Sequence, residues 1–317
     1  MILRNKMIKN KRGFQVSFAW LFAIIVGAFI LFLAIYGVIK ILNTGGEITS
    51  VKAGAELGVL LDPLETGFEA ERTVLLKMPV ETRIYNKYNT YGNFGKQIIQ
   101  VSQKNWGKWS QTNVDVSFQN KYIFSESVVE GKNFLIFSKP FEFPFKVANV
   151  IYLISSEKNY CFINAPEEIE EELLDLDQNN LLVENCLAKS LRVCFDAGIG
   201  PDFQECDISV DTGRREVEKE NQTMFFETDA LMYAAIFSDK SVYESQVKRL
   251  MKRTNELLLL YDDKAVLLSA QGCPLDVGLL VLRNVVNNVQ TSEDLVNAAN
   301  AADDVEREND YAECKLW

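Results

Sequence analysis

Six cysteines are the residues of this sequence best suited to covalent chemistry. They are Cys161, Cys186, Cys194, Cys206, Cys273 and Cys314. The 317-residue chain contains no histidine, so Ser-His-Asp catalysis, Cys-His catalysis and histidine-ligated zinc or haem are excluded. No Cys-x-x-Cys pair is present, which argues against a thiolate metal site. An even number of cysteines is typical of disulfides in an oxidising compartment; the alternative is a cytoplasmic domain with six reduced cysteines.

The spacing of the cysteines favours one of the fifteen possible sets of three disulfides. The favoured pairs flank one predicted turn, one predicted helix and the last two predicted helices. These pairs are Cys161–Cys186, Cys194–Cys206 and Cys273–Cys314. Each would close a loop whose cross-link stabilises the fold by about 3–4 kcal/mol. The other pairings remain open at this point.

Motifs for catalysis are few. Ser155 and Lys158 match the Ser-x-x-Lys spacing of Ser/Lys nucleophiles, but the motifs that accompany it in such enzymes are missing. Acidic residues are so frequent that no carboxylate pair stands out for hydrolysis. Phosphate-binding loops and calcium-binding loops are also absent from the sequence. We therefore predict no catalytic residue, cofactor or metal, and a role without catalysis; a surface hydrolase that uses carboxylates stays as the alternative.

One apolar segment near the start of the sequence determines where the rest of the chain lies relative to a membrane. Residues 14–39 include no ionisable side chain, and the basic tip before them, residues 1–13, has five basic residues. As a helix, residues 16–39 would reach roughly 36 Å, enough to cross a hydrocarbon core of about 30 Å. We predict a single transmembrane helix over 14–42, with the basic end in the cytoplasm and the remainder outside the cell. A cleaved signal peptide is the alternative, but its apolar core is shorter, about 7–15 residues.

The junction between the basic tip and the apolar segment reads Lys11-Arg12-Gly13-Phe14. It resembles the class III signal of archaeal prepilin-like membrane-anchored surface proteins, over residues 9–40 only. The resemblance implies that a peptidase cuts between Gly13 and Phe14 and leaves the apolar helix on the mature chain. The pilin pattern places a glutamate at the fifth mature position, where this chain has Phe18; that difference bears on filament assembly more than on processing.

The exterior part should have an α+β fold. Residues 43–47 have the composition of a short flexible connector. Period-two alternation predicts a mostly antiparallel, β-rich exterior domain over 43–240, in which the apolar run Leu231–Phe237 could be an inner strand. Helical periodicity predicts a helical exterior region over 241–317. Its last helix should open with a capping box formed by Thr291 and Asp294.

Charge limits the partners. The chain carries a net charge of −11, and residues 1–40 contribute six positive charges and no negative one, so the remainder carries −17. Such a domain repels nucleic acid. The expected partners are the lipid bilayer and, outside the cell, other envelope proteins, further copies of the chain or glycans.

Two surface features could serve an exterior domain. The triplet Asn221-Gln222-Thr223 is an acceptor for N-linked glycosylation. Exposed aromatic residues can also stack on sugars or bind partner proteins. The candidate binding patch consists of Tyr85, Tyr88, Tyr91, Phe94, Trp106 and Trp109, although packing in the β-rich core or at hairpin turns is the favoured explanation of these side chains. We therefore predict a structural or adhesive cell-surface or envelope protein, with a subunit of a membrane complex as a further alternative.

Overall fold

In the computed structural model the chain divides into two compact units, residues 1–48 and 49–317. The described residues are 18–66, 73–89, 94–105, 107–110, 115–196, 206–273 and 277–317. The proposed processing site at Gly13 and Phe14 lies outside these residues.

The first helix, α1, runs from Phe18 to Thr66. Its segment Phe18–Val38 comprises 21 residues with a mean hydropathy of 2.8, and none of it is buried. A helix that is apolar on all sides needs a surrounding apolar medium, and this one is long and apolar enough to cross a membrane. Residues 43–47 continue the same helix, so the prediction of a flexible connector was wrong. Extending a formed helix costs less free energy than starting a new one, even across two glycines.

The first sheet contains seven strands in the order β3-β2-β1-β6-β7-β5, with β4 also paired to β2. Their bounds are β1 Thr73–Asn89, β2 Lys96–Asn105, β3 Lys108–Trp109, β4 Val116–Phe118, β5 Tyr122–Phe124, β6 Val128–Glu142 and β7 Lys146–Ser155. Strand β1 pairs antiparallel with both β2 and β6, while β5 is parallel to β7. The predicted antiparallel arrangement therefore holds for this sheet except at one edge.

The last turns of α1 pack on this sheet through one face. Leu57 and Leu61 are buried among the apolar side chains of β1, β2, β6 and β7. Gly54 and Gly58 share that face, and their missing side chains allow a close approach to β4. A Cβ atom added at Gly58 would lie 2.6 Å from the ring of Phe118, and one at Gly54 would lie 3.1 Å from Val116.

The second sheet differs from the prediction. Its order is β13-β12-β11-β10-β8-β9, with bounds β8 Tyr160–Ile163, β9 Leu181–Val183, β10 Leu191–Phe195, β11 Ile208–Asp211, β12 Glu216–Lys219 and β13 Gln222–Phe225. Strands β8, β9, β10 and β11 pair in parallel, whereas β12 is antiparallel to both of its neighbours, β11 and β13. Period-two alternation shows which side chains share a face, but it does not show the direction of the neighbouring strand. Helix α2, Glu167–Asp175, lies in the chain between β8 and β9.

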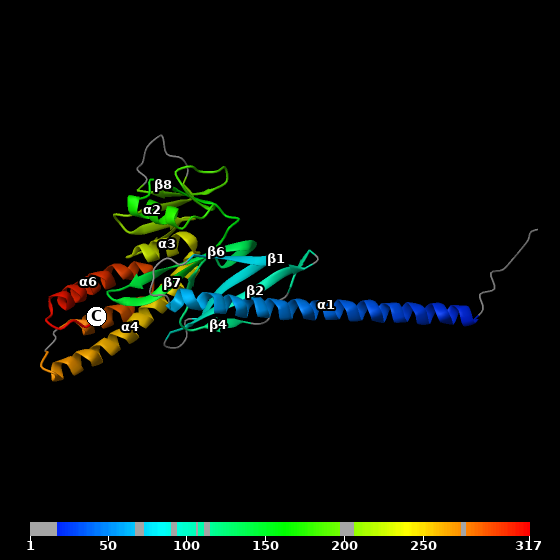
Figure 1. Cartoon of the computed structure of the whole chain (residues 1–317), viewed down its shortest axis with the longest axis horizontal. Coiled ribbons are helices and arrows are strands. Elements are labelled where there is room, and N and C mark those ends of the chain that lie inside the picture. Colours follow the sequence, from blue (N-terminus) through cyan, green and yellow to red (C-terminus); the bar gives the residue numbers. More distant parts are fainter. Residues whose placement is uncertain are drawn as a thin grey trace, which may run out of the picture. The chain divides into compact units, whose positions relative to one another are not determined.

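Helix α3, Asp229–Phe237, lies between the two sheets (Figure 1). Every residue from Ala230 to Phe237 is buried, so the predicted inner strand was wrong. A helix that is buried on all sides shows no polar stripe and cannot be told from a buried strand by periodicity. Thr228 caps the helix by accepting a hydrogen bond from the backbone N–H of Leu231 at 3.3 Å.

The remaining chain is helical, as predicted. Helix α4 covers Lys240–Ala270, α5 covers Leu279–Asn288, and a short 3-10 turn, Ser292–Asp294, leads into α6, Leu295–Tyr311. The capping box of Thr291 and Asp294 is confirmed. The aromatic ring of Trp317 packs against Phe145 and Tyr261, so the end of the chain is held on the first sheet and α4.

Three disulfides are present, and each joins the pair of cysteines that the spacing favoured. They are Cys161–Cys186, Cys194–Cys206 and Cys273–Cys314, with Cα–Cα distances of 5.4, 5.9 and 6.3 Å. Two of them hold segments of the second sheet, and the third ties the end of α4 to the chain after α6. Three disulfides and an apolar N-terminal helix are compatible with a membrane-anchored or exported protein.

Candidate functional site

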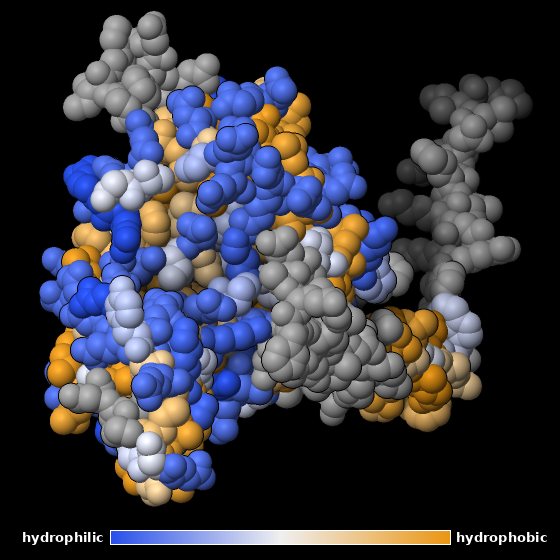
Figure 2. All heavy atoms as spheres, turned by 60° about the vertical axis from the view of Figure 1, so that its left-hand side comes forward, coloured by the Kyte–Doolittle hydropathy of each residue, from blue (hydrophilic) through white to orange (hydrophobic). Residues whose placement is uncertain are grey.

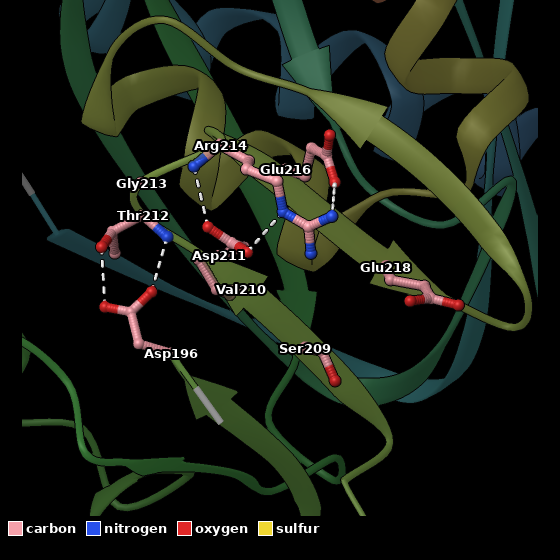
Figure 3. Close-up of a pocket in the computed structure, with 9 residues that line it drawn as sticks. All are labelled: Asp196, Ser209, Val210, Asp211, Thr212, Gly213, Arg214, Glu216 and Glu218. Carbon is pink, nitrogen blue, oxygen red and sulfur yellow. Dashed lines mark hydrogen bonds and ion pairs between the residues drawn. The ribbon is translucent and has the colours of Figure 1, made fainter. Parts of the chain in front are cut away.

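A cavity of about 600 Å³ lies at one end of the second sheet. Strands β11 and β12 and the turn between them supply most of its wall, and Asp196 adds a carboxylate from the end of β10 (Figure 3). The lining residues are Asp196, Ser209, Val210, Asp211, Thr212, Gly213, Arg214, Glu216 and Glu218. The lining is thus polar and mostly acidic, with one cationic side chain.

The charged groups of this cavity bind one another (Figure 3). The carboxylate of Asp196 accepts hydrogen bonds from the backbone N–H and the hydroxyl of Thr212, at 2.8 and 2.7 Å. Asp211 accepts from the backbone N–H and from Nε of Arg214, both at 2.7 Å. The guanidinium of Arg214 also lies 3.8 Å from Glu216. These contacts join the residues of the β11–β12 turn to one another and to Asp196 at the end of β10.

Two groups of this cavity, Asp211 and Arg214, stabilise each other in their charged forms. Hydrogen bonds from the Arg214 backbone and side chain hold the pKa of Asp211 below its usual range, and the same pair raises the pKa of Arg214. A carboxylate hydrolase needs one carboxyl whose pKa is raised, so that it can donate a proton near neutral pH. Among the described residues, no group of three or more His, Cys, Asp or Glu side chains is placed to hold a metal ion.

The Ser-x-x-Lys pair does not form a catalytic dyad. The hydroxyl of Ser155 donates to the backbone carbonyl of Glu130 at 2.7 Å. The ammonium of Lys158 instead binds the carboxylate of Glu126. The serine therefore has no hydrogen bond to the lysine side chain, which a nucleophile activated by lysine requires.

The aromatic side chains of the proposed binding patch lie on different surfaces. Tyr85 and Tyr88 are three residues apart on β1, so they point to opposite faces of the sheet. Trp109 has the guanidinium of Arg83 4.0 Å from its ring centre and the ammonium of Lys104 at 5.6 Å. The carbonyl of Phe94 accepts a hydrogen bond from α4. Tyr91 and Trp106 lie outside the described residues.

Polar residues that the sequence analysis did not single out lie under the first sheet. The guanidinium of Arg249 on α4 is fully buried and donates to three backbone carbonyls, those of Phe94 at 3.1 Å and of Gln119 and Lys121 at 2.9 Å. Burial lowers the pKa of Arg249 to about 10, so the side chain stays protonated at neutral pH. Three charge-assisted hydrogen bonds replace the water that burial removes.

An amide chain continues this buried network. The side chain of Gln246 donates to Gln97 at 2.7 Å, Gln97 donates to Asn86, and Asn86 donates to the hydroxyl of Ser125 at 2.8 Å. These groups lie inside the protein and join α4 to β1, β2 and the end of β5. The sequence contains no signal for this burial, because helical periodicity placed Arg249 on the face of the helix that points away from Val247 and Leu250.

A second surface is apolar. Five large aliphatic side chains on the last turns of α4 and the first turns of α5 are between 62% and 67% exposed. They are Leu260, Val266, Leu267, Leu280 and Val281, and we call them the apolar hairpin surface. The two helices lie side by side, with Arg283 of α5 4.0 Å from Asp262 of α4. Figure 2 brings this end of the molecule forward and shows hydrophobic atoms gathered there.

Comparison of the chain with known protein families, curated proteins and solved structures gives no match. The function must therefore be inferred from the chain itself.

Proposed function

We propose that this chain is a single-pass membrane protein whose disulfide-stabilised domain lies outside the cell and has a structural role. The observation that carries the proposal is the helix segment Phe18–Val38, which is apolar on all sides and has no buried residue. Three disulfides in the remainder of the chain support an oxidising compartment. The basic residues before the apolar segment support a cytoplasmic N-terminus.

A structural role is supported over hydrolysis by the chemistry of the acidic cavity. Its arginine binds Asp211 and Glu216, and the pKa of Asp211 is lowered rather than raised. The resemblance of residues 9–40 to prepilin-like proteins points the same way. We propose that the chain is cut between Gly13 and Phe14, so that the mature protein begins with the apolar helix.

The structural role would operate through the apolar hairpin surface, with a second copy of this chain as the occupant. Its five aliphatic side chains are each 62–67% exposed, and contact with an equivalent apolar surface would remove them from water. A lipid surface fits less well, because Asp262 and Asp263 lie among these residues on α4 and would be repelled by anionic head groups. Contact between two such helix pairs would bury both surfaces at once.

The topology can be tested on cells that make the full-length chain. Protease added to intact cells should degrade residues 49–317, and non-reducing mass spectrometry should find no free thiol and an N-terminus at Phe14. Protection of the domain in intact cells, together with its cleavage after lysis, would disprove the exterior placement.

Self-association can be tested by substitution within native membranes. Leu267→Glu combined with Leu280→Glu should abolish cross-linking between two copies, because each substitution places a charge in the contact. Leu174→Glu is the matched control, since Leu174 is 65% exposed on α2 and lies outside this surface. Equal cross-linking of all three proteins would show that the apolar hairpin surface is not the contact.

A further inference from the structure

The chain contains one Asn-x-Ser/Thr triplet, Asn221-Gln222-Thr223. We propose that Asn221 carries an N-linked glycan whose first sugar packs into the hollow beside the β12–β13 turn. This inference rests on the proposed function, because the modification requires that the domain lies on the exterior side of the membrane.

The acceptor lies at the apex of a tight turn. Strands β12 and β13 pair Lys219 with Gln222, so Glu220 and Asn221 alone form the loop. Both have positive φ angles, 54° and 58°, as a two-residue type I′ turn requires. Asparagine adopts this left-handed conformation more readily than most residues. Its side chain is exposed, so a glycan can be attached without displacing any part of the core.

The surroundings of the turn suit a sugar. A hollow of about 330 Å³ is lined by Lys219, Glu220, Gln222, Met224, Asp239, Lys240 and Ser241, which include the residues on both sides of Asn221. Hydroxyl groups of a sugar can accept hydrogen bonds from the lysine ammonium groups and donate to the carboxylates. The ammonium of Lys219 also donates to the carbonyls of Ile236 and Ser238 at the end of α3, both at 3.4 Å.

The rest of the triplet is held in place by the fold. The carbonyl of Thr223 accepts a hydrogen bond from the ammonium of Lys240 at 2.9 Å. The next outward-facing residue, Phe225, donates its N–H to Ser292 at 3.0 Å and accepts from the hydroxyl of Tyr243 at 2.5 Å. Side chains thus form hydrogen bonds with the backbone groups of Thr223 and Phe225 that face away from β12. These groups are then not available to pair with a further strand, and the turn remains accessible.

The transfer uses a lipid-linked oligosaccharide diphosphate as donor. A bond forms between the side-chain nitrogen of Asn221 and the anomeric carbon of the first sugar. The bond between that carbon and the phosphate oxygen breaks, the lipid diphosphate leaves with the electron pair, and the amide nitrogen loses one proton to solvent. No oxidant or reductant is needed.

The test uses the full-length protein purified from the membranes of its own source. Mass spectrometry of proteolytic peptides should find an oligosaccharide mass on nearly all peptides that contain Asn221. Asn221→Asp tolerates the left-handed turn and removes the acceptor amide, so it should lose the added mass; Thr223→Ala should also lose it, whereas Thr223→Ser should keep it. Asn164→Gln is the matched control, because Asn164 is exposed with a φ of 53° and lies in no such triplet.

Two outcomes overturn the inference and can be told apart by protease treatment of the same intact cells. An unmodified Asn221 in a domain that external protease degrades contradicts the glycan alone. An unmodified Asn221 in a domain that protease cannot reach contradicts the proposed function as well. An added mass that persists in Asn221→Asp places the modification elsewhere and also contradicts the proposal.

Discussion

The two sheets of residues 49–317 are held together in different ways. The first sheet, β1 to β7, contains no cysteine and is fixed by the end of α1, by α4 and by buried polar contacts. The second sheet, β8 to β13, has shorter strands and two disulfides. Every non-glycine residue with a positive φ angle that the structure describes lies between Asn164 and Asn221, in the connections around the second sheet.

The difference shows how a chain can stabilise a region with short strands and tight turns. Long strands bury continuous apolar faces against helices, and that burial drives folding. Short strands bury less per residue, so the cost of ordering their connections must be reduced in another way. A disulfide does this by restricting the unfolded chain. We therefore expect the first sheet to be sensitive to packing and the second sheet to reduction.

The largest effect should come from Arg249 under the first sheet. Arg249→Met leaves the carbonyls of Phe94, Gln119 and Lys121 without their buried donor, which should destabilise the protein by roughly 3–5 kcal/mol. Thermal unfolding of the solubilised full-length protein, followed by near-ultraviolet circular dichroism, measures this loss. Arg307→Met, at an exposed arginine on α6, should change the stability by less than about 0.5 kcal/mol. Equal melting temperatures for the two variants would contradict the account of the first sheet.

The second sheet should respond to loss of its disulfides. Replacing Cys161 and Cys186 together by alanine removes a cross-link between positions 25 residues apart and should cost about 3 kcal/mol. Hydrogen exchange should then accelerate in β8 to β11 before it changes in β1, β2 and β6. Uniform acceleration in both sheets would show that the two regions unfold as one and that the comparison is wrong.

A smaller effect should follow from filling the space at Gly58. The added methyl group of Gly58→Ala would lie 2.6 Å from the Phe118 ring and should destabilise the contact of α1 with β4 by about 1–2 kcal/mol. Phe118→Leu in the same chain should recover part of the loss. Gly213→Ala is the control, since its nearest neighbour, the carboxylate of Asp211, is 3.5 Å from the added Cβ. A stabilising Gly58→Ala substitution would mean that helix propensity outweighs the close approach.

The smallest effect concerns pH. Backbone hydrogen bonds from Thr291 and Gln290 hold the pKa of Asp294 below its usual range. Its contribution is fully present above the unfolded pKa of about 3.9 and is lost as pH falls through the lower folded pKa. The loss should be on the order of 0.5 kcal/mol, because the group is mostly exposed and screened. Melting temperatures between pH 5 and pH 2 should show that Asp294→Asn has lost this dependence, while Glu293→Gln retains it.

Sequence patterns gave the local features and missed those that depend on tertiary contacts. The helices of residues 241–317 and the capping box at Thr291 follow from periodicity and from spacing along the chain. The direction of β8 to β11 does not, since side-chain alternation is the same in parallel and antiparallel strands. The run Leu231–Phe237 forms a helix that is buried on all sides between the sheets. Such a helix has no polar stripe, so periodicity does not reveal it.

The candidate site could be predicted only in part, for the same physical reason. Each disulfide joins two cysteines that are consecutive in the sequence, so the pairing follows from the order of the cysteines and the elements between them. The network around Arg249 joins residues that are far apart in the chain. The acidic cavity depends on side-chain contacts within the β11–β12 turn and with Asp196. A single sequence has no pattern for such contacts.

The central claim is that the disulfide-bonded domain lies outside the cell, attached to the membrane by the apolar helix. Labelling intact cells with a thiol reagent that cannot cross membranes, before and after mild reduction, tests it most directly. The account predicts no label before reduction and labelling of the partly exposed Cys186, Cys206, Cys273 and Cys314 after it, identified by mass spectrometry. Thiols that are free in the native protein and that react only once the cells are opened would contradict it.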